Sequence, residues 1–182
     1  LNKVEPIFNT ENTELYIIET TYAGHAKEIA NQINLSNYDA FIAIGGDGTL
    51  HEVVNGMLTR DDGIKIPIGM IPGGSGNSYM HDLGLTNPIE AANAILRGQK
   101  RLVDTMHIDS NHVVQYAMNM IGWGLVAEVG KMAEKCRWLG PYRYTILSVL
   151  EVFRKKNHCA TLIMDDEKIV DDFTFIIACN SI

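Results

Sequence analysis

Cysteine and clustered basic residues are scarce in this sequence. The 182 residues include three widely spaced cysteines, which fit neither a disulfide framework nor a Cys-x-x-Cys metal site. The formal net charge is −7 and the longest basic run is Arg154–Lys156. A nucleic-acid-binding protein normally carries a basic surface, so we expect no nucleic-acid partner. The odd, scattered cysteines predict reduced thiols and an intracellular protein.

Long apolar runs are also missing. No stretch approaches the length of a membrane-spanning helix and no signal peptide is visible, so we expect a cytoplasmic protein. The chain begins with Leu1 rather than Met, and we interpret it as a fragment. Hydrophobic residues make up 46% of the sequence, which suffices for a packed core.

The first hundred residues alternate between strand and helix patterns. The continuous apolar run Ala40–Ile44 predicts a strand buried on both faces, and Thr49 and Glu52 form a Thr-x-x-Glu capping box for the helix that follows. This alternation predicts an α/β fold with a mainly parallel sheet. We expect strands at Glu14–Thr20, Ala40–Ile44 and Ile66–Ile71, and helices at Gly24–Ile33, Thr49–Leu58 and Pro88–Leu96.

The pattern changes after about Leu102, where short strand-like runs follow. We predict a nucleotide-binding α/β domain over residues 1–103, without its first strand, and the start of an incomplete β-rich domain over residues 104–182. In the second domain we expect strands at Arg101–Ile108, His112–Ile121, Cys159–Met164, Glu167–Val170 and Asp172–Cys179, and helices at Leu125–Lys135 and Arg143–Arg154.

Two glycine-rich stretches follow two of the predicted strands. GGDGT follows Ala40–Ile44, and PGGSGN follows Ile66–Ile71. Glycine loops at helix N-termini bind anions through backbone N–H groups, and the carboxyl ends of parallel strands meet at one edge of a sheet. Two such loops together favour a polyphosphate site over two simple tight turns.

Three named motifs are excluded. A Walker A loop ends in Gly-Lys-Ser/Thr, whereas this loop ends in Gly48-Thr49-Leu50. A Rossmann fingerprint needs a third glycine where His51 stands, and a zinc-protease helix needs a second histidine where Asn55 stands. Asp47 among phosphate-binding amides is either a turn residue, a proton acceptor or a Mg²⁺-linked carboxylate.

The stretch GGDGTLHEVVNG followed by PGGSGN resembles the catalytic domain shared by diacylglycerol kinases, sphingosine kinases, ceramide kinase and bacterial lipid kinases. Thr20–Ala30 and Gly122–Thr145 carry the resemblance further along the chain. GGDGT alone also occurs in NAD kinases and phosphofructokinases, which share this type of α/β domain. The resemblance implies that ATP, with Mg²⁺, phosphorylates a lipid hydroxyl in a cleft between the α/β domain and a β-sandwich domain.

The resemblance also implies a set of site residues. Asp47 matches the aspartate assigned as general base in sphingosine kinases. Arg137 and Arg143 match arginines that reach the nucleotide, although without the family they would be taken as ordinary surface charges. By position, the nucleotide site comprises Thr20, Thr21, Tyr22, Ala23, Gly24, Gly45, Gly46, Asp47, Gly48, Thr49, Glu52, Gly73, Gly74, Ser75, Arg137 and Arg143.

The sequence departs from the family pattern at three places. The family's opening Asn-Pro-x-Ser-Gly segment is not found before Leu1, and its further C-terminal strands are not found after Ile182. The acid that pairs with the sphingoid amine in sphingosine kinases falls at Gly130, two residues after Glu128. Whether the lipid is diacylglycerol, a sphingoid base or ceramide therefore stays open.

Several apolar residues of the second half fit either an acyl pocket or a core, and helical spacing favours core. They are Leu125, Val126, Ile146, Leu147, Val149 and Leu150. Because a lipid kinase must reach its substrate, transient membrane contact is a hypothesis. Two other functions stay open: an NAD kinase, and a non-catalytic module that senses a nucleotide or a lipid.

Overall fold

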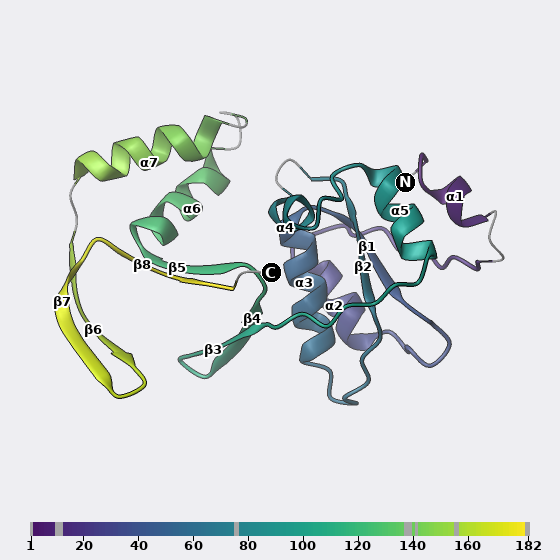
Figure 1. Cartoon of the computed structure of the whole chain (residues 1–182), viewed down its shortest axis with the longest axis horizontal. Coiled ribbons are helices and arrows are strands. Elements are labelled where there is room, and N and C mark those ends of the chain that lie inside the picture. Colours follow the sequence, from purple (N-terminus) through teal and green to yellow (C-terminus); the bar gives the residue numbers. More distant parts are fainter. Residues whose placement is uncertain are drawn as a thin grey trace. The chain divides into compact units, whose positions relative to one another are not determined.

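A computed structural model of the chain describes residues 2–9, 13–74, 77–136, 140, 142–154 and 157–180. It contains two compact units, Leu1–Met118 and Asn119–Ser181 (Figure 1). Each unit is described by itself below.

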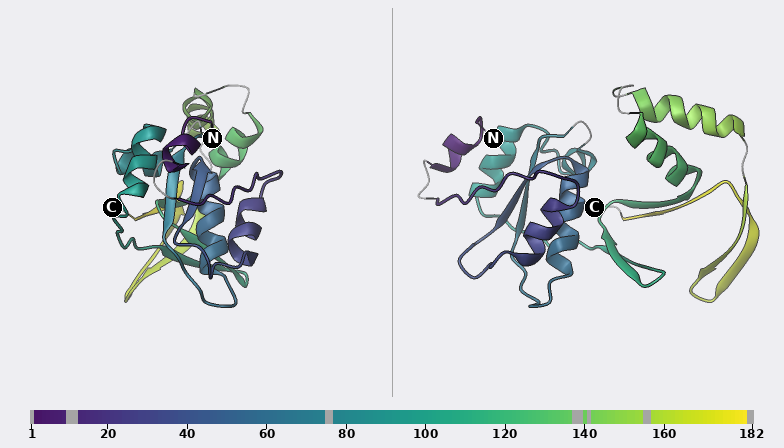
Figure 2. Two further views of the ribbon diagram at one scale, coloured as in Figure 1. Left: turned by 90° about the vertical axis from the view of Figure 1, so that its right-hand side faces the viewer. Right: turned by 180° about the vertical axis from the view of Figure 1, so that it is seen from behind.

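A pair of parallel strands forms the centre of the first unit. β1 (Phe41–Gly45) pairs with β2 (Ile68–Pro72). Helices cover both faces, as the views in Figure 2 show. One face carries α2 (His25–Gln32) and α3 (Asp47–Leu58), and the other carries α5 (Pro88–Leu96), against which α1 (Glu5–Asn9) packs. The predicted α/β class with parallel strands is confirmed.

The core of the first unit lies where the apolar stripes of these helices meet the strands. Val53 and Ile71 are each 1% exposed, and Ala30 and Ala92 are fully buried. Small alanines on α2 and α5 let the helices lie close to their neighbours. This rigid arrangement fixes the carboxyl edge of the strands, where the glycine loops begin.

A hairpin completes the first unit. β3 (Met106–Ser110) pairs antiparallel with β4 (Val113–Ala117), and β4 contacts α3. The compact units therefore divide after Met118. The domain division expected after residue 103 stays a prediction.

The described residues of the second unit form two antiparallel strand pairs and two helices. Val129, Ala133 and Leu147 form its small buried cluster. β5 (Met120–Gly124) pairs with β8 (Phe175–Cys179), and β6 (His158–Met164) pairs with β7 (Glu167–Phe173). The helices are α6 (Leu125–Lys135) and α7 (Arg143–Arg154).

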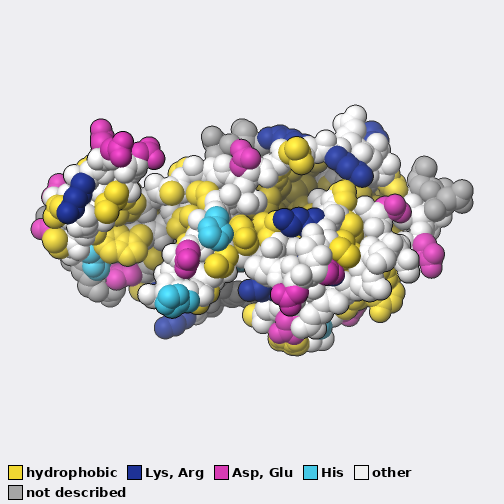
Figure 3. Space-filling view, turned by 90° about the horizontal axis from the view of Figure 1, so that it is seen from below, with side chains coloured by type: hydrophobic (Ala, Val, Ile, Leu, Met, Phe, Trp, Pro, Cys, Tyr) yellow, Lys and Arg dark blue, Asp and Glu magenta, His cyan; other side chains and the backbone are white. Residues whose placement is uncertain are grey.

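Apolar side chains stand on the surface of the second unit (Figure 3). Ile146, Val149 and Leu150 on α7 are 42%, 51% and 53% exposed, whereas Leu147 is buried. The expectation that all of these residues form core is wrong for the first three. An amphipathic helix buries one stripe only, and the buried stripe of α7 passes through Leu147.

Local predictions fail where the structure depends on a distant partner. Glu14–Thr20 is not a strand, because within the described chain it pairs with no other strand. The apolar run His112–Ile121 contains two strands, β4 and the start of β5, rather than one. Neither α1 nor α4 (Ser78–Asp82) was predicted, since a helix of five residues is too short to show a period.

Candidate functional site

Two glycine loops leave the same edge of the β1–β2 pair. Gly45 lies opposite Pro72 at the carboxyl ends of the two strands. The N–H groups of Gly73 and Gly74 both donate to the carbonyl oxygen of Gly45, at 2.7 and 3.1 Å. The predicted meeting of the two loops is confirmed, and the loops are joined by direct backbone hydrogen bonds.

Close backbone contact explains the glycine at position 74. A Cβ atom there would lie 2.5 Å from the Cα atom of Gly46 and 2.9 Å from its nitrogen. No side chain fits such a gap, so the two loops can touch only if residue 74 is glycine. The role that sequence analysis gives these glycines, close approach to phosphate, stays a prediction.

Asp47 holds the second loop from the first turn of α3. Its Oδ2 atom accepts hydrogen bonds from the N–H groups of Asn77 at 3.1 Å and Ser78 at 2.9 Å. Its Oδ1 atom accepts one from the N–H of Tyr79 at 3.2 Å. The carboxylate thus caps the N-terminus of α4, which is the role that a capping aspartate plays in its own helix.

Asn77 shapes the turn between the second loop and α4. Its backbone has a φ of 144°, a conformation that residues other than glycine rarely adopt. Its side-chain Nδ2 donates to the carbonyl of Gly74 at 2.9 Å, and its Oδ1 accepts from the N–H of Gly74 at 3.2 Å. These two bonds stabilise the strained turn. Asn77 lies within PGGSGN but was not among the predicted site residues.

The N-terminus of α3 faces the loops without a side-chain cap. Its N-cap residue is Gly46, and in the described structure no side chain accepts from its first N–H groups. The predicted capping box of Thr49 and Glu52 is wrong, because the helix begins at Asp47 and places both residues inside it. An uncapped helix start of this kind is available to an anion.

The segment Thr20–Gly24 precedes α2 and is held by local contacts. The ring of Tyr22 stacks on His25 with centroids 4.5 Å apart, and the N–H of Thr21 donates to Nδ1 of His25 at 3.1 Å. The hydroxyl of Tyr22 donates to Glu28, and this hydrogen bond raises the pKa of Tyr22. Tyr22 is 54% exposed, so its ring remains accessible to a planar ligand.

Glu52 links that segment to α3. Its Oε1 accepts from the N–H of Gly24 at 2.9 Å and its Oε2 from the N–H of Ala26 at 3.2 Å. Asp47 and Glu52 are therefore both bound to backbone amides of other segments. The predicted role of Glu52 at the nucleotide stays a prediction.

Three of the predicted site residues cannot be placed beside the loops. Ser75 and Arg137 lie outside the described residues. Arg143 is the first residue of α7, in the second unit, and its side chain lies outside the described part of the chain. Gly48 and Thr49 lie in the first turn of α3, next to the loops.

Asn55 is a buried polar residue to which sequence reasoning gave no definite role. It is 2% exposed and lies two turns along α3 from Asp47. Its Nδ2 donates to the carbonyl of Tyr116 at 2.9 Å, and its Oδ1 accepts from the N–H of Tyr116 at 2.8 Å. This reciprocal pair joins α3 to β4. The sequence signal for this buried position was an asparagine between the apolar residues Val54 and Met57.

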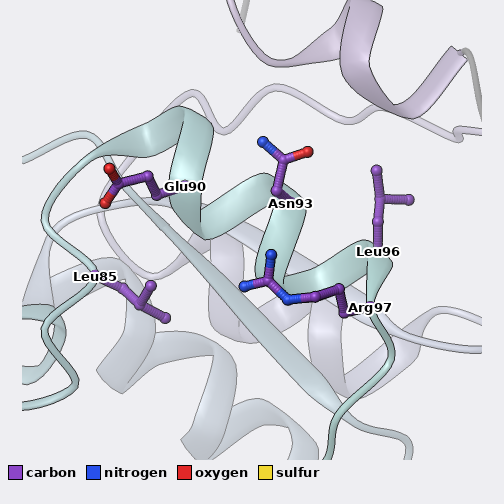
Figure 4. Close-up of a pocket in the computed structure, with 5 residues that line it drawn as sticks. All are labelled: Leu85, Glu90, Asn93, Leu96 and Arg97. Carbon is purple, nitrogen blue, oxygen red and sulfur yellow. The ribbon is translucent and has the colours of Figure 1, made fainter.

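Cavities lined by described residues lie in the first unit. One of about 430 Å³ adjoins the second loop, with Ile44, Pro72 and Gly73 in its wall. Another of about 520 Å³ lies against α5 and is lined by residues that the sequence patterns did not single out, with Glu90 and Asn93 on the helix and Arg97 just after its end (Figure 4). The chemistry of the glycine loops favours the first as part of the site.

The first 108 residues match the model of the diacylglycerol kinase catalytic domain. The chain belongs to the diacylglycerol kinase catalytic domain family. The match spans residues 1–108 and thus contains both glycine loops, Asp47 and Glu52. The family suggested by the glycine motifs is confirmed.

Named relatives of this family member are lipid kinases. It is 41% identical to Sphingosine kinase 1 of Arabidopsis thaliana, over 82% of the chain and 33% of the relative. It is 32% identical to Sphingoid long chain base kinase 4 of Schizosaccharomyces pombe, over 90% of the chain and 37% of the relative. The chain thus spans about a third of the length of these curated relatives.

A solved member of the family has the same fold. A crystal structure of a diacylglycerol kinase from Bacillus anthracis superposes with a TM-score of 0.72 at 25% identity, covering 99% of the chain and 57% of that structure.

The described residues contain no group of three or more His, Cys, Asp or Glu side chains that could hold a metal ion. Among the same residues, no helix has both the length and the apolar character of a bilayer-spanning helix.

Proposed function

We propose that the protein transfers the γ-phosphoryl group of ATP to the hydroxyl group of a lipid. The observation that supports this most is the joining of two glycine loops at the uncapped N-terminus of α3, beside Asp47. Phosphoryl transfer requires positioning and charge stabilisation more than covalent chemistry by the protein. Fixed backbone N–H groups at a helix N-terminus provide both for a phosphate chain.

Asp47 is proposed as the residue that accepts the proton of the lipid hydroxyl. A carboxylate has about four lone-pair positions. Oδ2 accepts two N–H groups, whereas Oδ1 accepts one, from Tyr79. Oδ1 therefore retains a position for the substrate hydroxyl, and the three N–H groups hold the carboxylate in place. In this role Asp47 is the general base of the reaction.

Mg²⁺ is proposed as the cofactor. It is usually held by one or two carboxylates together with the phosphates of the nucleotide, so the lack of a preformed acidic cluster among the described residues is compatible with it. Asp47 is the described carboxylate beside the loops that could hold Mg²⁺, directly or through water. The ion would neutralise part of the negative charge of the phosphates.

A sphingoid base is the proposed class of acceptor. The relatives reported above are named sphingosine and sphingoid base kinases. The position that matches the acid pairing with the sphingoid amine is Gly130, and Glu128 lies two residues before it. Access to such a substrate requires transient contact with a membrane surface, which is part of this proposal.

Labelled phosphate transfer tests the proposed function. The full-length protein is incubated with γ-labelled ATP and Mg²⁺ and, in separate reactions, with sphingosine, ceramide, diacylglycerol or NAD. We expect label on sphingosine. Label on NAD would place the protein among NAD kinases. If ATP binds and no acceptor is labelled, the non-catalytic sensing module replaces the kinase.

A further inference from the structure

The first turn of α2 is capped by a side chain from another helix. Gly24, the N-cap residue of α2, has a φ of 94° and offers no side chain for capping. The carboxylate of Glu52 accepts from the N–H groups of Gly24 and Ala26 instead. A negative group at a helix N-terminus satisfies unpaired N–H groups and interacts favourably with the helix dipole.

The opposite end of α2 is bound by the same neighbouring chain segment. Nη1 of Arg60, two residues past α3, donates to the carbonyls of Ala30 at 2.8 Å and Ile33 at 3.0 Å. Arg60 is itself paired with Asp62, and its side chain is 4% exposed. A positive group at a helix C-terminus is favourable for the same electrostatic reason. α2 thus has an acid at its start and a base at its end, both supplied by α3 and the residues after it.

Close packing between these ends keeps the two helices in register. A Cβ atom on Gly56 would lie 2.3 Å from the carbonyl oxygen of Lys27 and 2.8 Å from the Cβ of Ala30. Nδ2 of Asn31 donates to the carbonyl of Thr59 at 3.0 Å. The helices therefore run in the same direction in direct backbone contact. Among the polar contacts between α2 and the α3 segment, the hydrogen bonds of Glu52 lie next to Thr20–Gly24.

We propose that Glu52 is a positioning residue that sets where Thr20–Gly24 lies relative to the glycine loops. Glu52 stands five residues after Asp47 in the same helix. α3 therefore holds the second glycine loop through Asp47 and the segment Thr20–Gly24 through Glu52. This inference rests on the proposed function and on the resemblance by which Thr20–Gly24 lines the same nucleotide. Glu52 then acts on ATP binding through the backbone of Gly24, without contacting the nucleotide or the metal.

Substitutions at the two ends of α2 test this in the full-length protein. Glu52→Ala removes the cap at the nucleotide segment, and Arg60→Gln is the matched control that removes contacts at the far end. We expect Glu52→Ala to raise the KM for ATP about tenfold, in line with the loss of a cap interaction, and to leave kcat nearly unchanged. Glu52→Gln keeps one acceptor oxygen and is expected to lie between Glu52→Ala and the natural protein. Arg60→Gln is expected to lower the unfolding midpoint and leave that KM unchanged. Equal KM values in Glu52→Ala and Arg60→Gln would overturn the proposal.

Amide hydrogen exchange supplies a readout that does not depend on activity. In Glu52→Ala the N–H groups of Gly24 and Ala26 are expected to exchange about ten- to a hundredfold faster, and in Arg60→Gln to stay unchanged. If Glu52→Ala needs more ATP or Mg²⁺ for activity while the exchange rates of Gly24 and Ala26 are unchanged, Glu52 is a direct ligand. That result would contradict the proposal. If the natural protein neither binds ATP nor transfers phosphate, the proposed function fails, and the exchange result still decides whether Glu52 holds the segment.

Discussion

Asn55 joins α3 to the β3–β4 hairpin through a single buried side chain. Its amide makes two hydrogen bonds with the backbone of Tyr116 and a third with the carbonyl of His51 at 2.8 Å. All the polar atoms of the side chain are thereby satisfied, as a buried amide requires. Because Tyr116 lies two residues before the end of the first unit, this bond fixes where the chain leaves that unit.

Asn55→Ala is expected to lower the free energy of unfolding by about 2–3 kcal/mol, since it leaves the N–H and carbonyl of Tyr116 without their partner. Urea unfolding followed by circular dichroism measures this. The matched control is Asn93→Ala on α5, where the side chain is exposed and donates only to the carbonyl of Ile89. Its expected change is within about 0.5 kcal/mol. Equal losses in the two variants would show that the pair with Tyr116 contributes nothing.

Asp62 makes the stability of the first unit depend on pH. Its hydrogen bond to Arg60, followed by that from the N–H of Ile64, lowers the pKa of its carboxyl group below the ordinary value of 3.8. A lowered pKa in the folded state stabilises the protein at pH values above the ordinary pKa of the group. This contribution is lost as the pH falls through the folded-state pKa. Asp62→Asn should therefore reduce the decrease in the free energy of unfolding at acidic pH. Unfolding midpoints measured from neutral pH to about pH 2 test this dependence on pH. If the midpoints of the variant and the natural protein fall equally at acidic pH, the prediction is contradicted.

At the scale of single residues, the sequence predicts that the two glycine loops meet but not the hydrogen bonds that join them. Asp47 stands out because a carboxylate among glycines is chemically unusual, and the structure does place it between the loops. Its three N–H partners could not be predicted, since they come from residues about thirty positions away that form a helix of one turn. The same holds for Glu52, whose partners lie on a different helix.

At the scale of elements, the contact between the glycine loops is sensitive to one methyl group. Gly74→Ala would force the backbone of Gly46 to move, and we expect a loss of about 2 kcal/mol in the free energy of unfolding. Gly48→Ala is the control, because a Cβ atom at Gly48 meets nothing within 4 Å and the residue lies inside α3. That variant is expected to be more stable by about 0.5–1 kcal/mol. Denaturant unfolding of both variants is the measurement, and equal stability of the two would contradict the close loop contact.

Long periodic elements could be predicted and short or paired ones could not. α5 begins and ends where the sequence predicts, because Pro88 marks its first turn and Gly98 follows its end. β1 and β2 were also predicted, since a continuous apolar run followed by glycine is a strong local signal. Glu14–Thr20 has the composition of a strand, but a strand exists only where another strand pairs with it. The capping box failed for the same reason, because Glu52 binds an element that is distant in the sequence.

At the scale of the whole molecule, the two units differ in how well they bury their apolar residues. The first unit contains most of the buried core among the described residues, whereas the second leaves residues such as Val149, Leu150 and Phe175 at least half exposed. The family match covers residues 1–108 and thus lies within the first unit. The fold class and the meeting of the glycine loops could therefore be predicted from sequence, whereas the pairing of strands in the second unit could not be predicted from local patterns.

The rate of phosphate transfer by Asp47→Asn, at saturating ATP and sphingosine, tests the central claim most directly. The substitution keeps the size of the side chain and removes its ability to accept a proton. We expect the rate to fall about 10²- to 10⁴-fold, as for loss of a general base, while ATP affinity measured in parallel changes little. A variant that transfers phosphate to the lipid at the rate of the natural protein would contradict the account.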